Sequence, residues 1–490
     1  MTDEILDQKK ARLEKLAALE EKGINAYPHV YRPTFTSQAL NEQYKDLPND
    51  TMTEDSVRVA GRVRAIRNSG MFMDIYDATG KVQIFSSLEN LPDSEKEILA
   101  LLDLGDIIGV EGTVRRTKRG ELSVATTHLT VLSKSLQPFP DKFHGLQDTD
   151  TKYRQRYLDM IVNQETTQTL VLRSRIISTI RRYLDAKGFL EVETPMLHPI
   201  MGGATAKPFI THHNTLDMDL YLRIAPELYL KRLIIGGLPA IYEIGRNFRN
   251  EGMDTSHNPE FTMMELYWVY KDYNDMMDLF ENLVQTVAKE LLGTTTVKLG
   301  DNVIELGGHW PRKPMLTLVQ EATGVDFLQF KDGESAAQEA EKLGVHVEKN
   351  ASWGKVVETV FEEKCEQNLI QPIFVIDHPQ DISPLTKTHR SNARLVERFE
   401  PFINGWEVGN AYSELTNPLD QKERLEAQVR LRSGGDAEAQ MMDDDFVTAL
   451  EYGMPPTGGL GMGIDRLVMI LAQTTSIRDV IAFPTMRKKS

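Results

Sequence analysis

Residues 3–22 place apolar side chains at mixed spacings of three and four among charged positions, and Gly23 follows. This pattern predicts an amphipathic helix that ends at the glycine. Between about residues 55 and 135 the pattern changes to five short apolar or alternating runs, separated by turn sequences such as NSG, ATG and KRG. Five short strands joined by turns indicate a small β-barrel.

The elements lengthen beyond about residue 150. Helical periodicity covers 170–187 and stops at Gly188, and it returns at 271–292 and 334–344. Strand-like runs occupy 219–224 and 240–249. Long helices and strands mixed in this way predict a large α+β domain, built on an antiparallel β-sheet flanked by helices.

The chain therefore divides into segments. We expect an N-terminal helical extension over 1–50, the barrel over 51–140, a linker over 141–165 and the large domain over 166–490, with a helical insertion around 271–350. The linker begins in the stretch PFPDKFHGLQD, where proline interrupts regular structure. With 490 residues the chain can bury a core in each domain.

Composition excludes several classes of protein. Hydrophobic residues make up 41% and charged residues 26%, which excludes wholesale disorder. The single cysteine, Cys365, excludes an internal disulfide framework and a thiolate zinc site. The first residues are charged, and no apolar run is long enough to cross a membrane, so we expect a cytoplasmic protein without membrane contact. The net charge of −16 argues against passive nucleic-acid binding but allows a local basic patch.

Arginines and carboxylates recur on the predicted strand faces. Because strand side chains alternate, a strand over 241–249 places Glu243 and Arg249 on one face, with Arg249 at its end. The returning strand groups Glu265 with Tyr267, after a loop over about 250–259. The stretch EVGNAYSE puts three more polar residues on one face, namely Asn410, Tyr412 and Glu414. Acids at this density on a sheet require cations, metals or a ligand.

A glycine-rich strand, TGGLGMGIDRL, opens into a helix near Asp465. Glycines let a ligand approach the backbone. Arg466 follows at the predicted helix N-terminus, where free N–H groups and the helix dipole already favour an anion. The sequence thus predicts an anion site that uses Arg249 and Arg466.

These stretches together resemble the class II aminoacyl-tRNA synthetases. RNFRNEG with the downstream HNPEF resembles their motif 2, GMGIDR resembles motif 3, and GFLEVETPML, with Pro195, resembles motif 1 at the dimer interface. APELYLKRL, the acids Glu227, Glu265 and Glu414, and the barrel are similar to the lysyl-tRNA synthetases of bacterial type. The resemblance covers about residues 5 to 487, and its motifs are specific in combination.

The resemblance implies a fold and a reaction. The barrel would be a five-stranded OB-fold that binds the anticodon, followed by a class II catalytic domain. The enzyme would activate L-lysine with ATP to lysyl-adenylate and pyrophosphate, and then transfer lysine to the 3′-terminal adenosine of tRNA(Lys). It would use Mg²⁺, act as a homodimer and have Arg249 and Arg466 as its catalytic residues.

The resemblance also implies roles for individual residues. ATP would be bound by Arg249, Glu251, His257, Asn258, Phe261, Glu400, Glu407 and Arg466, with Mg²⁺ on Glu400 and Glu407. Glu227, Tyr267 and Glu414 would surround the ε-ammonium of lysine, Gly203, Glu265 and Asn410 its α-amino and carboxylate end, and Tyr412 its stem. Anticodon contacts would come from Arg64, Phe72, Gln83 and Glu121, although Arg58, Arg62 and Arg67 offer alternative basic residues.

Three alternatives remain at this point. A synthetase for aspartate or asparagine shares the barrel and catalytic domain, but it needs a cation or an amide reader where this chain has Glu227 and Glu414. A lysyltransferase that modifies a translation factor lacks the barrel. Loss of Arg249, Arg466, Glu400 or Glu407 would signal a non-catalytic tRNA-binding or regulatory paralogue, and all four residues are present.

Overall fold

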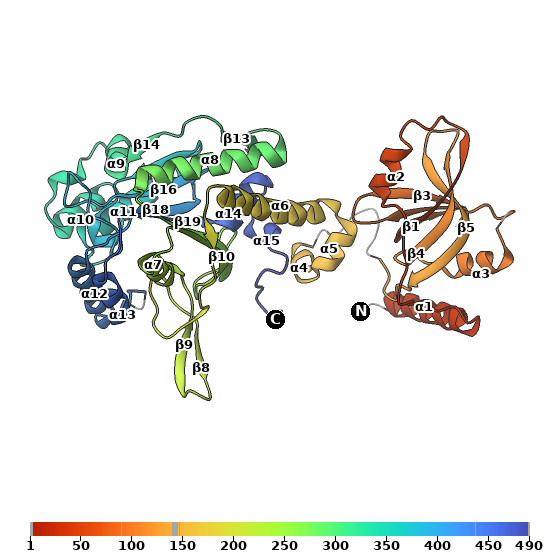
Figure 1. The fold of residues 1–490 in the computed structure, drawn as a ribbon, viewed down its shortest axis with the longest axis horizontal. Helices are drawn as coiled ribbons and strands as arrows, with labels where there is room; N and C mark the ends of the chain where they lie inside the picture. Colours follow the sequence, from red (N-terminus) through yellow and green to blue (C-terminus); the bar gives the residue numbers. More distant parts are fainter. Residues whose placement is uncertain (1–2, 90, 140–145, 147, 437, 489–490) are drawn as a thin grey trace. The chain divides into compact units, whose positions relative to one another are not determined.

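The computed structural model describes residues 3–89, 91–139, 146, 148–436 and 438–488. Contacts within the chain divide it into two compact units, Met1–Gly145 and Leu146–Ser490, and each unit is described by itself. Figure 1 labels the elements of both units. None of the helices within the described ranges is long and apolar enough to cross a membrane.

The first unit is a barrel with three helices around it (Figure 1). Its five strands form a closed barrel in the order β1-β2-β3-β5-β4, in which only β3 and β5 pair in parallel. Its elements are α1 (Asp3–Glu21), α2 (Ser37–Gln43), β1 (Thr51–Arg67), β2 (Phe72–Tyr76), β3 (Lys81–Phe85), α3 (Asp93–Leu101), β4 (Ile107–Arg116) and β5 (Leu122–Ser133). The predicted five-stranded barrel is therefore confirmed.

Strand alternation builds the core of this barrel. Met73 and Ile75 of β2 and Val82 and Ile84 of β3 are almost fully buried, whereas the residues between them point outward. Helix α1 ends where the sequence predicts, and Gly23 after it has φ +70°, a backbone conformation that glycine adopts without strain. The sequence analysis did not predict α3, which follows Pro92 and buries Ile98 and Leu99.

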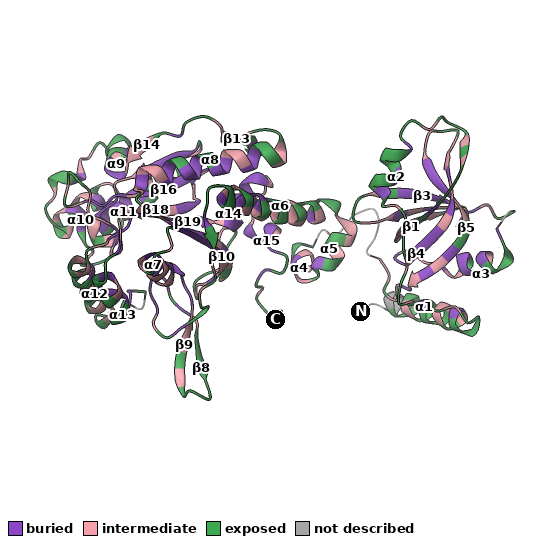
Figure 2. Cartoon of the chain, viewed as in Figure 1, coloured by how far each residue is buried: buried purple, intermediate pink, exposed green. Residues whose placement is uncertain are grey.

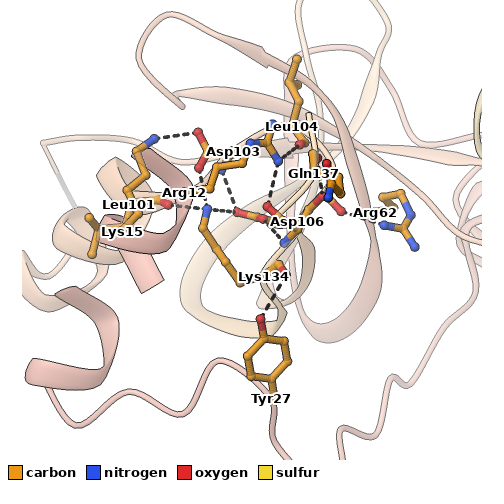
Figure 3. Close-up of polar contacts among 12 residues, drawn as sticks. Arg12, Lys15, Tyr27, Arg62, Leu101, Asp103, Leu104, Asp106, Lys134 and Gln137 are labelled. Carbon is orange, nitrogen blue, oxygen red and sulfur yellow. Dashed lines mark hydrogen bonds and ion pairs between the residues drawn. The ribbon is translucent and has the colours of Figure 1, made fainter. Parts of the chain in front are cut away.

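A buried ion cluster joins α1 to the barrel (Figure 3). The Lys134 ammonium is fully buried and donates to Asp103 at 2.6 Å, to Asp106 at 2.7 Å and to the carbonyl of Leu101 at 2.8 Å. Lys15 of α1 donates to the same Asp103 at 2.6 Å. Arg12, one turn earlier, donates to two carbonyl oxygens beside the cluster. The helix is thus held by charged hydrogen bonds as well as by its apolar face.

The second unit is built on a long mixed sheet. Its strand order is β14-β15-β16-β18-β19-β11-β10-β6, with β17 on β16; the central pairs are antiparallel, and only β14 and β6 at the two ends pair in parallel. The sheet strands are β6 (Leu190–Glu191), β10 (Ala240–Phe248), β11 (Glu260–Val269), β14 (Arg312–Pro314), β15 (Ile373–Ile376), β16 (Arg398–Ile403), β17 (Trp406–Glu407), β18 (Gly409–Ser413) and β19 (Thr457–Gly463). This confirms the antiparallel-dominated sheet.

Two smaller sheets and a set of helices complete the unit. The smaller strands are β7 (Leu197–His198), β8 (Ile210–His213), β9 (Met218–Leu222), β12 (Thr296–Leu299) and β13 (Asn302–Glu305). The helices are α4 (Thr149–Arg154), α5 (Arg156–Val162), α6 (Gln164–Ala186), α7 (Glu227–Ile235), α8 (Tyr273–Leu292), α9 (Met315–Thr323), α10 (Gly333–Lys342), α11 (Trp353–Lys364), α12 (Pro418–Ser433), α13 (Asp444–Glu451), α14 (Ile464–Leu471) and α15 (Ile477–Val480), with 3₁₀ turns at Phe327–Gln329, Glu366–Asn368 and Gln380–Ile382.

The two faces of the sheet have different neighbours. Even-numbered residues of β11 and β19, such as Met264 and Leu460, pack into the main core with α6, α8 and α14. Odd-numbered residues, such as Tyr267, face the other side, where α7, α12 and α13 supply a second apolar cluster. Figure 2 shows the buried sheet and α14 in purple, and the exposed strand β8 in green. The odd-numbered face is the one that carries the predicted site residues.

The stretch 141–165, which the sequence predicts as a linker, holds two short helices. Arg156 of α5 is fully buried, donates to the carbonyls of Ala482 and Ile481 at 2.9 and 3.0 Å, and pairs with Asp159. These contacts tie α5 to the C-terminal segment of the same unit. The sequence pattern gave no sign of this attachment, because it depends on a pairing across more than 300 residues.

The Lys134 cluster gives a stability prediction for the first unit. Lys134→Met leaves Asp106 buried without its ammonium partner, and we expect the free energy of unfolding of the barrel to fall by about 3–5 kcal/mol. Hydrogen exchange measured by mass spectrometry in the full chain should show faster exchange in β4 and β5. In the control Lys45→Met an exposed pair with Glu42 is lost, which should cost about 1 kcal/mol or less. Equal exchange in the two variants would contradict the prediction.

Candidate functional site

Neighbouring strands bring the predicted site residues together at the centre of the sheet. Strands β11, β19 and β18 lie side by side, so residues that share a register position meet on one face. Two successive rows cross these strands: Glu265–Gly461–Asn410 and Tyr267–Gly459–Tyr412. Glu265 and Asn410 are 145 positions apart in the sequence, as are Tyr267 and Tyr412, and the strand order brings them together.

Glycines in the middle strand leave the space that the acids occupy. A Cβ on Gly459 would lie 1.8 Å from Glu414 Oε1, and one on Gly461 would lie 3.2 Å from Met263. Gly203 has φ +90°, and a Cβ there would approach the Cβ of Glu227 to 3.1 Å. Gly459 and Gly461 therefore provide room for side chains from β11 and for Glu414, and Gly203 provides room beside Glu227 of α7.

Three carboxylates and two tyrosines line the end of this space nearest α7. Glu227, Glu265 and Glu414 are all at least 94% buried. Tyr412 donates its hydroxyl to Glu227 Oε2 at 2.7 Å, and Tyr267 donates to Glu265 Oε2 at 3.2 Å. The sequence analysis predicted these five residues as one site, and the structure brings them together.

A buried lysine that the sequence analysis did not select lies among these acids. Lys231 of α7 donates to Glu227 Oε1 at 2.6 Å and forms an ion pair with Glu414 Oε2. Apart from that ion pair, neither Glu414 oxygen has a hydrogen-bond partner within the described part of the chain. The available signal was the spacing of four between Glu227 and Lys231, which places both on one face of a helix.

The sequence analysis also did not select two arginines, of which Arg223 is buried and Arg398 is half-buried. Arg223 is 1% exposed, pairs with Glu243 and donates to the carbonyl of Arg246 at 2.9 Å. Arg398 donates to Asn410 Oδ1 at 2.9 Å and to Glu400 Oε1 at 2.5 Å. Arg398 therefore orients two predicted site residues, Asn410 and Glu400, whereas Arg223 pairs with Glu243 on β10.

Burial disfavours ionisation of the acid groups. It raises the pKa of Glu265 to about 8, and the charge of Glu227 adds to this effect. Burial also raises the pKa of Glu414 to about 8, although the Lys231 ammonium lowers it. The pKa values of Tyr267 and Tyr412 lie well above their usual value for the same reason. A further cation brought among these groups would be strongly bound as the carboxyls ionise.

Arg249 supplies the opposite charge near the end of β10. Its backbone N–H donates to the carbonyl of Pro259 at 2.9 Å, and its guanidinium lies over the Phe261 ring, 5.1 Å from the centroid. No carboxylate among the described residues forms an ion pair with it, and its buried Nε has no hydrogen-bond partner there. Burial lowers the pKa of Arg249. A buried donor of this kind is satisfied by an anionic ligand.

Arg466 and His257 lie together at the other side of the anion site. Arg466 lies in the first turn of α14, contacts the carbonyl of Glu407, and has Nη2 3.1 Å from His257 Nε2. The other ring nitrogen of His257 lies 2.9 Å from Asp254. A cation from the start of α14 and an imidazole from the loop between β10 and β11 therefore lie next to each other.

Two further carboxylates lie close to Arg466. Glu400 on β16 and Glu407 on β17 lie on paired strands, and Arg398 contacts Glu400. Burial raises the pKa of Glu400, and burial together with the charge of Glu400 raises that of Glu407. The described residues contain no cluster of three or more histidine, cysteine or acidic residues that could hold a metal alone. Two carboxylates do suit a hard cation that shares its remaining positions with water and phosphate.

The remaining predicted residues lie at the edges of the site. Glu251 is exposed in the loop after Arg249. The Asn258 amide is buried, donates to the carbonyl of Glu260 at 2.6 Å and accepts from the backbone of Thr485 at 3.3 Å. Pro195 is exposed and its carbonyl lies 2.8 Å from a ring nitrogen of His198.

The barrel presents a separate aromatic and basic face. Phe72 and Phe85 pair with ring centroids 5.2 Å apart, and the Arg64 guanidinium lies 4.5 Å from the centroid of Tyr76. Gln83 accepts a hydrogen bond from Ser123 at 2.8 Å. Glu121 pairs with Lys81 at 2.7 Å. Outward-facing rings beside guanidinium groups suit stacking with bases and contact with phosphates.

The large unit can therefore bind a ligand that carries separate charges. Its acid end suits an ammonium group, and its arginines suit a carboxylate or a phosphate. Nothing in this arrangement resembles a nucleophile–base pair, so the chemistry it favours is charge neutralisation and positioning.

Comparison with known proteins identifies relatives across nearly the whole chain. A family model described as tRNA synthetases class II (D, K and N) matches residues 148–487, and an OB-fold nucleic acid binding domain model matches 57–132. A lysine–tRNA ligase of Sinorhizobium medicae is 52% identical over 485 residues, which cover 99% of this chain and 97% of that protein.

Two other relatives have the same description. A lysine–tRNA ligase of Carboxydothermus hydrogenoformans is 53% identical over 482 residues, covering 98% of each protein. A lysine–tRNA ligase of Bacillus cytotoxicus is 50% identical over 491 residues, covering 99% of this chain and 98% of that protein.

The glycines of β19 give a prediction about the site. Gly459→Ala forces a methyl group against Glu414 and Tyr267, and we expect overpacking to cost about 1–3 kcal/mol of unfolding free energy. Gly252→Ala is the control, because a Cβ there meets nothing within 4 Å. Urea unfolding followed by tryptophan fluorescence measures the difference, since all four tryptophans lie in the second unit. Equal midpoints for the two variants would show that the space is not tight.

Proposed function

The chain belongs to the class II tRNA synthetases of the D, K and N group, and we propose that it acts as a lysine–tRNA ligase. It activates L-lysine with ATP and transfers the lysyl group to tRNA(Lys). The observation that carries this proposal is the buried acid end of the site, where Glu227 and Glu414 lie beside Tyr267 and Tyr412. Among aspartate, lysine and asparagine, only lysine has a cationic side chain that such an end can bind.

The ε-ammonium of lysine binds at Glu414 and Tyr267, with Glu227 beside them. Glu265 and Asn410, with the backbone at Gly203, hold the α-amino and carboxylate end, and Tyr412 lines the stem. The support for this assignment is the row of residues across β11, β19 and β18, which places Glu265 opposite Asn410 and Tyr267 opposite Tyr412. The two rows are successive on the strands, as a ligand with two separated polar ends requires.

Arg249 neutralises the reacting groups. Its guanidinium has no ion-pair partner in the described ranges, so it can hold both the substrate carboxylate and the α-phosphate of ATP. Phe261 stacks on the adenine, and His257, Asn258 and Glu251 contact the nucleotide. Arg466 holds the γ-phosphate from the first turn of α14. These roles suit the positions of the residues around one space.

Glu400 and Glu407 are the residues that would hold Mg²⁺. Their oxygen donors and raised pKa values suit a hard cation that takes up the excess negative charge. When bound, the ion neutralises phosphate charge. Arg398 fixes Glu400 through a hydrogen bond of 2.5 Å, so this carboxylate is already oriented.

The reaction then follows in two steps. A carboxylate oxygen of lysine attacks the α-phosphorus of ATP, the bond to pyrophosphate breaks, and lysyl-adenylate forms. This nucleophile is already ionised, so the residues of the site position and neutralise charge without a general base. In the second step the 3′-terminal ribose hydroxyl of tRNA attacks the carbonyl carbon, and AMP leaves.

The barrel supplies the anticodon contacts. Phe72 offers a stacking surface, Gln83 a hydrogen-bonding amide, and Arg64 a cation beside Tyr76. Glu121 lies at the edge of the same face through its pair with Lys81. The local basic and aromatic character of this face supports binding of RNA by a chain whose net charge is −16.

The active form is a cytoplasmic homodimer with Pro195 at the interface. Large apolar side chains around Pro195 support this assignment, because Met196 and Leu197 are 45% and 44% exposed and Leu190 is 49% exposed. Apolar side chains gathered in this way are commonly covered by a partner.

A non-catalytic paralogue is the alternative, and it fits less well. Such a protein has no need to keep Arg249 unpaired or to bury three carboxylates, since both features cost stability without a ligand. A site for aspartate or asparagine is disfavoured by the same acid groups.

Arg249→Ala tests the proposed chemistry. We expect lysine-dependent exchange of pyrophosphate into ATP to fall about 100-fold or more, because one charged donor to the reacting groups is lost. Arg246→Ala is the matched control: it lies on the same strand, pairs weakly with Glu260 at 3.7 Å, and should keep most of the activity. Wild-type exchange in the Arg249 variant would remove this residue from the mechanism.

The raised pKa values predict how lysine affinity depends on pH. Glu265 and Glu414, each with a pKa of about 8, carry protons in acidic solution, and they must release them to pair with the two ammonium groups. Lysine binding therefore strengthens as pH rises toward 8. Between about pH 6 and 7.5 we expect the Kd to fall about tenfold per pH unit for each carboxyl that must release a proton on binding. Isothermal titration calorimetry measures it.

Glu265→Gln provides the control for this pH dependence. The variant has lost one of the two titrating carboxyls, so its plot of log Kd against pH should be shallower than that of the unmodified protein. A Kd for lysine that stays constant over this range would contradict the assignment of these carboxyls to the ammonium groups.

A further inference from the structure

Lys231 introduces a cation of the protein into the acid end of the site. Its side chain is completely buried, and its Nζ contacts Glu227 Oε1 at 2.6 Å and forms an ion pair with Glu414. The rings of Tyr412 and Phe446 lie 5.6 and 6.0 Å from Nζ. Lys231 thus contacts both of the acids proposed to face the substrate side chain.

The charges of the occupied site balance only if Lys231 is counted. The negative groups are Glu227, Glu265, Glu414 and the substrate carboxylate. The positive groups are Lys231, Arg249 and the two ammonium groups of lysine, so each sign contributes four charges. Without Lys231 one buried carboxylate would lack a cation, and leaving such a charge unpaired is strongly unfavourable.

We propose that Lys231 is a positioning residue that acts as a permanent internal cation of the amino-acid site, so that Glu227 and Glu414 together present one net negative charge to the ε-ammonium. The inference rests on the proposed function, since it concerns how the same site selects lysine. It adds a residue for which the resemblance implies no role.

The hydrogen bonds assign different tasks to the two acids. Glu227 uses Oε1 for Lys231 and Oε2 for the hydroxyl of Tyr412, so both of its oxygens are engaged within the protein. Glu414 contacts Lys231 through Oε2 only, and its buried Oε1 has no hydrogen-bond partner among the described residues. The ε-ammonium is therefore received by Glu414, while Glu227 keeps Lys231 and Tyr412 in place.

The ionisable groups around Glu414 come from three elements. Lys231 and Glu227 come from α7, Glu265 and Tyr267 from β11, and Tyr412 from β18. Lys231 is the sole cation in this set. Burial opposes its charge, but Glu227 and Glu414 outweigh burial and raise the pKa of Lys231, so it stays protonated.

A double-mutant cycle on Glu227 and Lys231 tests the charge balance. Lys231→Met leaves Glu227 and Glu414 with a proton between them in place of the Lys231 ammonium. This proton must be released before the substrate ammonium can bind. Glu227→Gln leaves Glu414 fully neutralised by Lys231, so the substrate ammonium meets no net charge. We expect each single change to raise the Kd for lysine at least about tenfold at pH 7, measured by calorimetry.

The combined variant gives the decisive result. Glu227→Gln with Lys231→Met restores one net negative charge on Glu414, and it should bind lysine more tightly than Glu227→Gln alone. If Lys231 acted only in packing, its loss would weaken lysine binding both in the unmodified protein and in the Glu227→Gln variant. Of Glu227, Lys231 and Glu414, only Glu414 remains ionisable in the double variant. The comparison with Glu227→Gln therefore stands even if Lys231→Met alone does not fold.

Arg232→Met is the matched control. Arg232 neighbours Lys231 on α7 and also pairs with two acids, Asp443 and Asp445, but these line a cavity whose lining includes neither Glu227 nor Glu414. This variant should bind lysine as the unmodified protein does. If the unmodified protein fails to bind lysine, the proposed function and this inference both fall; if it binds lysine but the double variant is no tighter than Glu227→Gln, only the inference falls.

Discussion

Burial of carboxylates on one face of a β-sheet is the constraint on which the rest of the site depends. Glu227, Glu265 and Glu414 are at least 94% buried, and each must meet a cation or give up its charge. The protein meets part of this demand with Lys231, and we propose that the substrate meets the remainder. On this proposal the site selects an ammonium side chain, because a carboxylate or an amide cannot provide the missing charge.

The sheet makes this burial possible through its register and its glycines. Adjacent rows on β11, β19 and β18 alternate between the apolar core and the site, so Glu265 has the core residues Met264 and Leu266 on either side of it along β11. Gly459 and Gly461 leave space where any side chain would collide with an acid or with Met263. The end of β19 then opens into α14, which places Arg466 beside His257. One strand thus borders both the ammonium end and the anion end of the site.

Much of this arrangement could be predicted from local sequence patterns. The alternation in FTMMELY and EVGNAYSE identified the inward-facing residues, and the glycine-rich strand before Asp465 identified the start of the helix that carries Arg466. Short strands with clear turns predicted the barrel. These features depend on neighbours within about ten residues, and such patterns survive folding because strand and helix periodicities are fixed.

Other parts depend on contacts that no local pattern encodes. Lys231 and Glu414 are 183 positions apart, and their pairing requires α7 to lie against β18. Arg223 and Arg398 are ordinary strand-end arginines in the sequence, and only the fold pairs them with Glu243 and Glu400. The attachment of α5 through Arg156 to residues near 481 is of the same kind. Only the assembled sheet reveals which charges share one buried space.

The most direct test of this account is exchange of radiolabelled pyrophosphate into ATP, measured with each standard amino acid in turn and without tRNA. The account predicts exchange with lysine and background exchange with aspartate, asparagine and the other amino acids. Exchange supported by an amino acid without a cationic side chain would contradict the claim that the buried acids select the substrate, and absence of exchange with every amino acid would contradict the proposed activity.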